Sequence, residues 1–207
     1  LYTVFHPKNL SVSVNVPASD PAFDYRKLAS SADHLILMAY DEHWSTGTPG
    51  PIASLPWFAK VLRQRQHDVP AAKTIVAIGN YAYDWENGHP AEERTFEEAV
   101  LVAKESEGAI HLDPVSLNPT FDYADDNDRI HHVWMLDAVT AFNQLAVVGS
   151  IRPRGVALWR LGSEDPALWR VFGKTGPMDA ARAAELGEIH FGYGLDYEGK
   201  GEVLEIT

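Results

Sequence analysis

Four short apolar segments alternate with segments of helical character, and this order limits the folds open to the sequence. The four segments are predicted strands at Leu10–Val16, His34–Tyr40, Thr74–Gly79 and Gly155–Trp159. The second is almost continuously aliphatic, which is typical of a parallel strand covered on both faces. Predicted helices follow at Asp20–Ala32, Ser54–Gln66, Phe96–Glu105 and Pro166–Phe172. Alternation of this kind predicts an α/β fold with a parallel sheet and right-handed crossovers.

One connection is too long for a simple loop. Asp113–Trp134 is predicted to form an inserted β-ribbon with an acidic turn at Asp125–Asp128, followed by a helix at Leu136–Val148. The chain beyond about Gly176 is first Ala-rich and then rich in Gly, Tyr and Glu, which predicts a linker and a small hairpin at Ile189–Ile206. We therefore expect one domain at 1–175 and a connector at 176–207.

The composition excludes several classes of function. A net charge of −12 disfavours nucleic acid and anionic membrane surfaces as partners, because both would be repelled at long range. No stretch approaches the roughly 18 apolar residues of a membrane span, and Leu1–Asn9 lacks the features of a signal peptide. The absence of cysteine excludes disulfides, thiolate catalysis and sulfur-ligated metals. We expect neither a cofactor nor a metal.

Two motifs superficially indicate other chemistry. His131 and His132 are adjacent on a predicted strand and should point to opposite faces, so they are poorly placed to chelate one ion. Asp126–Asn127–Asp128 contains the Asp-x-Asp of nucleotide-sugar transferases but lies in an acidic turn, which favours a solvated turn.

Polar and aromatic residues begin where the predicted strands end. The second strand ends in Met38, Tyr40, Asp41 and Glu42, the third in Asn80, Tyr81, Tyr83, Asp84 and Trp85, and the last in Trp159 and Arg160. In a (β/α)8 barrel the active site is built from the carboxyl ends of the strands. Aromatic rings pack on the C–H faces of pyranose sugars, and carboxylates and amides bind sugar hydroxyls. The pattern predicts a sugar-binding cleft.

These residues resemble glycoside hydrolase family 18. Met38–Ala39–Tyr40–Asp41 is similar to the motif on the sixth strand of that barrel, and Trp159 stands where the eighth strand carries its Trp. The runs Tyr40–Trp44, Pro49–Ser54 and Val133–Trp134 are similar to the branch with spore-cortex peptidoglycan hydrolases, and above all to modules fused to a polysaccharide deacetylase and a family 2 glycosyltransferase. The resemblance covers about Leu10–Phe172 and implies roughly strands five to eight, the C-terminal half of the barrel.

The resemblance implies a substrate and a mechanism. Family 18 enzymes cleave β-1,4 bonds next to N-acetylglucosamine, with the acetamido oxygen of the sugar as nucleophile. Tyr40 would donate its hydroxyl to that oxygen and Asp41 would hold the sugar, so these two are the expected catalytic residues. The expected substrate-binding residues are Met38, Glu42, Asn80, Tyr81, Tyr83, Trp85, Asp137 and Trp159. Asp41 and Asp137 have an alternative role as caps of a loop or helix.

One departure from the family concerns catalysis itself. The general acid of family 18 is the Glu that ends an Asp-x-x-Asp-x-Glu pattern, and the nearest match here, Asp122 and Asp125, is followed by Asn127. We therefore expect this chain alone to be inactive. The alternatives are a lectin-like carbohydrate-binding module and a scaffold domain of a polysaccharide-processing protein. Half a barrel has exposed sheet edges, so association with another chain or with the missing half is expected. The family implies a location outside the cytoplasm.

Overall fold

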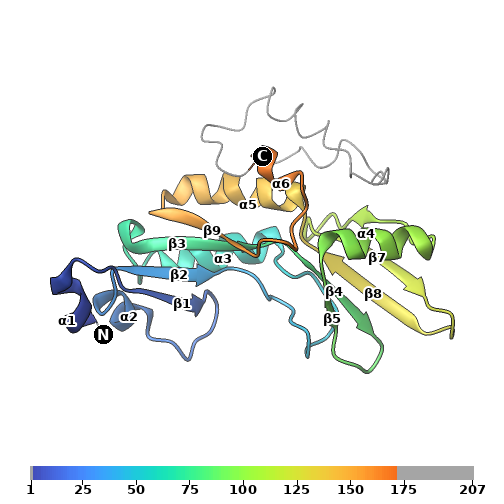
Figure 1. Ribbon diagram of the computed structural model, residues 1–207, viewed down its shortest axis with the longest axis horizontal. Coiled ribbons are helices and arrows are strands. Elements are labelled where there is room, and N and C mark those ends of the chain that lie inside the picture. Colours follow the sequence, from blue (N-terminus) through green and yellow to red (C-terminus); the bar gives the residue numbers. More distant parts are fainter. Residues whose placement is uncertain (1, 172–207) are drawn as a thin grey trace.

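A computed structural model describes residues 2–171 of the 207-residue chain, which form two sheets side by side (Figure 1). The first sheet has four parallel strands in the order β1-β2-β3-β9. The second has five antiparallel strands in the order β5-β4-β8-β7-β6. The α/β class predicted from the sequence is confirmed, and the second sheet is inserted between β3 and β9.

The strands of the two sheets have the following bounds. The parallel sheet contains β1 (Ser13–Pro17), β2 (His34–Met38), β3 (Thr74–Gly79) and β9 (Gly155–Trp159). The antiparallel sheet contains β4 (Ala82–Glu86), β5 (Glu92–Arg94), β6 (His111–Leu112), β7 (Pro119–Ala124) and β8 (Ile130–Met135).

Side-chain caps fix where the longer helices begin. Ser54 accepts the Trp57 N–H at the start of α3 (Leu55–Arg65), and Thr95 forms a capping box with Glu98 at the start of α4 (Phe96–Glu105). Asp137 accepts the Thr140 N–H at the start of α5 (Ala138–Ile151). The shorter helices are α1 (Tyr2–Phe5), α2 (Tyr25–Ser30) and α6 (Leu168–Val171), with 3-10 turns at His6–Lys8 and Ala71–Lys73.

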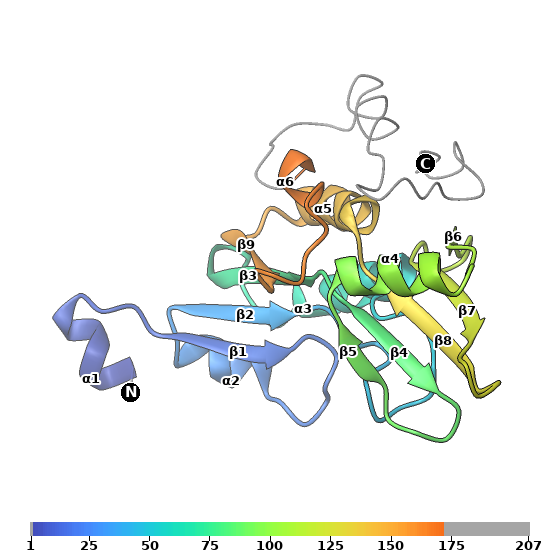
Figure 2. The same cartoon turned by 45° about the vertical axis from the view of Figure 1, so that its right-hand side comes forward.

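The helices divide the core into separate clusters. The larger cluster joins alternate residues of the parallel sheet, such as Leu37 and Val76, to α3, α5 and α6. α4 covers one face of the antiparallel sheet through a second cluster that includes Phe96 and Val133 (Figure 2). A third cluster, with Tyr81, Tyr83 and Trp85, lies where the two sheets meet and packs against Ile52 and Ala53.

Two predictions from the sequence differ from the structure. The helix expected at Asp20–Ala32 is confined to α2, because Asp24 provides the cap and the Asp20 carboxylate instead accepts the Ala22 N–H in a turn. The residues after Gly79 were expected to end the third strand, but Ala82–Glu86 form a separate strand, β4. The ribbon is therefore part of a larger sheet. The hairpin expected at Ile189–Ile206 lies outside the described residues.

Candidate functional site

The candidate site lies at the carboxyl edge of the parallel sheet, where the predicted residues converge. Tyr40 and Asp41 follow β2, Tyr81 follows β3, and Trp159 ends β9. Gly79 and Trp159 are paired in the register of β3 and β9, so the two strands end side by side at the same edge of the sheet. Because β4 begins three residues after β3 ends, the antiparallel sheet forms a wall beside this edge.

Asp41 is the acceptor at the centre of the site. Its Oδ1 accepts the Tyr81 hydroxyl and, at 3.2 Å, the Tyr83 hydroxyl. Its backbone is left-handed, with φ of 60°. Such a conformation costs a non-glycine residue about 1–3 kcal/mol and persists where surrounding contacts hold it. The two phenols supply such contacts, so the carboxylate is held in one orientation at the end of β2.

Close packing between Tyr40 and Tyr81 requires a residue without a side chain at position 79. A Cβ at Gly79 would lie 2.8 Å from the Tyr81 ring, 2.9 Å from Leu136 and 3.2 Å from the Tyr40 Cβ. The rings of Tyr40 and Tyr81 meet edge to face, with 6.2 Å between centroids. Gly79 therefore sets the approach of β2 and β3 beneath the site.

Tyr40 and Trp159 present two aromatic rings at the same edge. The rings are nearly parallel, with centroids 6.3 Å apart, and Trp159 is 46% exposed. Within residues 2–171, no group hydrogen-bonds to the Tyr40 hydroxyl. Burial, together with the charge of Asp41, raises the pKa of Tyr40 to about 12. The hydroxyl therefore keeps its proton at neutral pH and can donate it in a hydrogen bond to a ligand.

The aromatic residues of the wall contribute hydroxyl groups to the site, and their ring faces are buried. Tyr81 is 2%, Tyr83 7% and Trp85 1% exposed, so their rings pack in the cluster between the sheets. Burial raises the pKa of Tyr83 well above its usual range, and the charges of Asp41 and Glu93 act in the same direction. The substrate-binding role expected of Trp85 does not fit its burial, and its ring packs edge to face against Tyr83 instead, with 5.3 Å between centroids.

Met38 and Glu42 flank the central pair. Met38 is half-buried on the sheet face that it shares with Ala77 and Ala157, opposite the face that packs on the helices. The Glu42 carboxylate accepts the Ser54 N–H at 2.8 Å. Glu42 therefore ties the loop after β2 to the start of α3, which is a structural contact.

Asn80 and Asp137 lie beneath the site. Both are fully buried. The Asn80 amide donates to the Asp137 carbonyl and accepts the Asp165 N–H, while Asp137 caps α5. Of the two roles expected for Asp137, the contacts fit the helix cap.

Asp165 was not predicted from the sequence, since nothing in its local pattern indicates burial. Its carboxylate accepts the N–H groups of Ala138 and Ala167, at 3.0 and 2.8 Å. Burial and the neighbouring Asp137 raise the pKa of Asp165 to about 6. This carboxylate holds the segment after Trp159 against the start of α5.

Trp44 is a second residue that the sequence reasoning passed over. It is 54% exposed, and its indole N–H donates to Thr46 at 3.0 Å. Its loop is bound to the wall, because the Ser45 carbonyl accepts the Ala91 N–H at 2.6 Å. The sequence feature that indicates Trp44 is its position four residues after Tyr40, in a loop rich in Gly and Pro.

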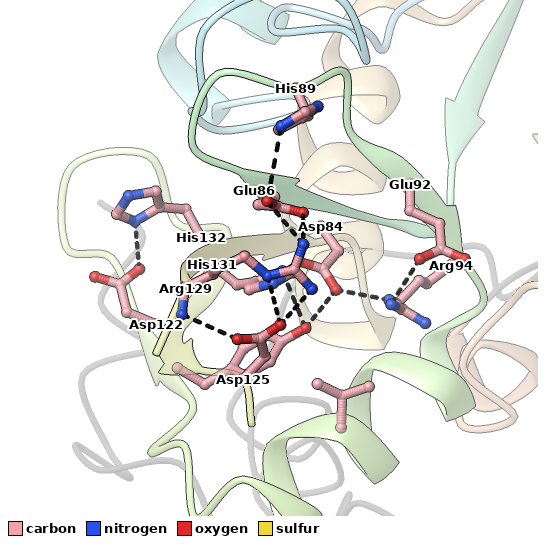
Figure 3. A network of polar contacts seen from close by, with 12 residues as sticks. Asp84, Glu86, His89, Glu92, Arg94, Asp122, Asp125, Arg129, His131 and His132 are labelled. Carbon is pink, nitrogen blue, oxygen red and sulfur yellow. Dashed lines mark hydrogen bonds and ion pairs between the residues drawn. The ribbon is translucent and has the colours of Figure 1, made fainter. Parts of the chain in front are cut away.

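The far end of the wall contains a network of ion pairs (Figure 3). The buried Asp84 carboxylate contacts His131 and Arg94, each at 2.8 Å, and also accepts the Tyr123 hydroxyl. His132 instead contacts Asp122. The two histidines bind different carboxylates, as their expected opposite orientations require. Among residues 2–171, no group of three or more His, Asp or Glu side chains is arranged to hold a metal.

The sequence matches a known family and known proteins. The family model of glycosyl hydrolases family 18 matches residues 3–164. The cortical fragment-lytic enzyme of Bacillus subtilis (strain 168) is 26% identical over 180 residues, covering 80% of this chain and 42% of that protein. The uncharacterized glycosylase YvbX of the same organism is 28% identical, covering 81% of this chain and 52% of that protein. The chain thus spans about half the length of these relatives.

Solved structures agree in fold. The chitinase from Chromobacterium violaceum ATCC 12472 superposes with a TM-score of 0.76 at 29% identity, covering 82% of this chain and 56% of that one. The Bacillus cereus spore cortex-lytic enzyme SleL gives a TM-score of 0.71 at 25% identity, covering 80% and 40%. The parallel sheet and its helices are accordingly part of a (β/α)8 barrel. No helix within residues 2–171 is long and apolar enough to cross a membrane. With most of its length matched by the family model, the chain belongs to glycosyl hydrolases family 18.

Proposed function

We propose that this chain forms the acetamide-binding half of a site for β-1,4-linked N-acetylglucosamine polysaccharide. The observation that carries the proposal is the nearly parallel pair formed by the half-buried Tyr40 and the exposed Trp159 beside an oriented Asp41 carboxylate. Trp159 offers a face for the pyranose ring, and Tyr40 and Asp41 offer a donor and an acceptor next to it.

The proposed reaction is hydrolysis assisted by the substrate, whose acetamido oxygen attacks the anomeric carbon. Tyr40 would donate its hydroxyl to that oxygen and orient it for attack. Asp41 would accept the acetamido N–H and so favour the charge that develops on the acetamide. No side chain of this protein acts as the nucleophile in this scheme.

The leaving-group oxygen needs a proton, and this chain has no Asp-x-x-Asp-x-Glu pattern to supply it. We place the general acid outside these 207 residues. The four-stranded sheet supports this assignment, because β1 and β9 are its edge strands and an open parallel edge favours pairing with another segment. The remaining half of a barrel, or another chain, would bring the acid to the edge that carries Tyr40.

A carbohydrate-binding module without catalysis is the second candidate. It is favoured by the same missing pattern, since a site with Trp159, Tyr40 and Asp41 retains its groups for binding sugar. In either case the polymer would be met outside the cytoplasm, as the names of the spore cortex-lytic relatives suggest.

Calorimetry with N-acetylglucosamine oligomers tests the proposal on the parent chain and Tyr40→Phe. We expect the parent to bind, and loss of one hydrogen bond to weaken binding roughly 2- to 12-fold. The parent chain alone should release no reducing ends. An unchanged affinity in Tyr40→Phe would remove Tyr40 from the site, and hydrolysis by the chain alone would show that its acid lies within these residues.

A further inference from the structure

Arg160 lies next to Trp159 and has a fixed backbone. The Arg160 carbonyl accepts the Ser163 N–H and hydroxyl, at 3.4 and 3.1 Å, and the Trp159 carbonyl accepts the Asn80 N–H at 2.8 Å. These hydrogen bonds fix the backbone from which both the Trp159 and the Arg160 side chains extend.

The guanidinium group is directed toward the wall. Its Nη1 lies 2.9 Å from the Glu93 carboxylate on β5. Glu93 is the cross-strand partner of Tyr83, whose hydroxyl donates to Asp41. The contacts from Trp159 through Arg160, Glu93 and Tyr83 therefore lead back to Asp41, and Arg160 is on the border of the candidate site.

The ion pair between Arg160 and Glu93 is not needed to hold the two sheets together. Both side chains are well exposed, Arg160 at 51% and Glu93 at 40%, and exposed pairs contribute little to stability. A backbone hydrogen bond of 2.9 Å from Phe96 to the Ser163 carbonyl already joins the same segments.

Other arginines of the wall are more fully engaged. Arg94 contacts Asp84 and Glu92, and Arg129 contacts Glu86 and Asp125 (Figure 3). For Arg160 the described residues provide one ion pair, through Nη1. A guanidinium carries five N–H donors in a fixed fork that fits a carboxylate, so donors remain for a ligand.

We propose that Arg160, oriented by Glu93, binds a carboxylate carried by the glycan on the sugar next to the ring stacked on Trp159. The inference rests on the proposed function and narrows its substrate class to acidic glycans. A neutral chitin-like chain would leave the remaining N–H donors of Arg160 without a carboxylate from the ligand.

Calorimetry with three disaccharides tests the proposal on the 207-residue chain. The neutral one is N,N′-diacetylchitobiose. One acidic probe carries the lactyl carboxylate of N-acetylmuramic acid, and the other carries glucuronic acid, so the two sources of a carboxylate are distinguished. We expect one acidic probe to bind roughly tenfold more tightly than the neutral one, and this preference to decline as salt is added.

Variants assign the preference to one side chain. Arg160→Gln should abolish the preference while leaving affinity for the neutral disaccharide, and Arg160→Lys should retain part of it. Arg129→Gln is the matched control, since Arg129 is 50% exposed and also ion-paired, but on the β7–β8 hairpin. It should behave as the parent.

Two outcomes would overturn the inference and spare the proposed function: equal binding of all three probes, or an acidic preference that survives in Arg160→Gln. Failure to bind any of the probes would contradict both.

Discussion

The ring of Tyr40 lies nearly parallel to the indole of Trp159, with 20° between the planes and 6.3 Å between the centroids. Tyr40 follows β2 and Trp159 ends β9, with β3 between these two strands. The aromatic surface is therefore assembled by the sheet from residues more than a hundred positions apart in the sequence.

Replacing Trp159 with Ala should weaken binding of N-acetylglucosamine oligomers. An aromatic contact contributes about 0.5–1.5 kcal/mol beyond the area that it buries, so the dissociation constant should rise at least 2- to 12-fold. Calorimetry measures the change. Trp169→Ala is the control, because Trp169 is 50% exposed but lies on α6. Equal losses in the two variants would contradict a specific platform at Trp159.

Asp41→Asn should lower the pKa of Tyr40 below about 12 but leave it above its usual value, because burial is the larger cause of the raised pKa and the charge of Asp41 adds to it. Asn tolerates the left-handed backbone at this position, so the fold should persist. Absorbance of the phenolate during an alkaline titration reports the shift. A titration that is unchanged from the parent would mean that the carboxylate has no electrostatic influence on the site.

Asp165 should make stability depend on pH between about 4 and 6. Its pKa is about 6 in the folded protein, against 3.8 for an ordinary aspartate, so folding favours the protonated form. The contribution of Asp165 to stability should therefore be greatest below about pH 4, fall as the pH rises to about 6, and then level off. The full difference corresponds to about 3 kcal/mol.

Urea unfolding of the parent and of Asp165→Asn at several pH values measures this dependence. The variant loses the titrating group, so the difference in unfolding free energy between the two proteins should change across pH 4–6. The variant should also differ from the parent in absolute stability. The Ala138 and Ala167 N–H groups bind different oxygens of the Asp165 carboxylate, and an amide replaces one of these oxygens by NH2, which cannot accept a hydrogen bond. A constant difference across this range would contradict a raised pKa.

Gly79→Ala should disturb the site and the stability together. The added Cβ would lie 2.8 Å from the Tyr81 ring and 2.9 Å from Leu136, so these side chains would have to shift. Overpacking of this kind costs about 1–3 kcal/mol. Gly155→Ala is a matched control in the same sheet, since its Cβ would meet nothing within 4 Å. Thermal unfolding and glycan binding should separate the two variants.

The sequence predicted the parallel sheet well, because its signal is local. Thr74–Gly79 and Gly155–Trp159 were predicted with the bounds that the structure shows, since apolar runs bounded by polar residues mark buried strands. β4 was missed because Tyr83 and Trp85 alternate with Asp84 and Glu86, a pattern that also suits a cleft. Its partner β8 lies about fifty residues further along the chain, and local patterns do not reveal such pairing.

The site was predictable to the extent that it depends on strand ends. Tyr40, Asp41 and Trp159 are brought to one edge by a parallel register that the alternation of strands and helices implies. The burial of Asn80 and Asp137 follows from the segment that contains Asp165, which folds over them from more than twenty residues away. No local pattern indicates which carboxylates such a segment will cover.

The pairing of β4 with β8 also restricts how this protein can vary. Tyr83 faces Asp41, while Asp84 on the opposite face contacts Arg94 and His131 beneath α4. Inserting a single residue ahead of Tyr83 would reverse both, because neighbouring strand positions point in opposite directions. Relatives should therefore tolerate changes of length in the turn between β4 and β5, whereas β4 itself should gain or lose residues only in twos.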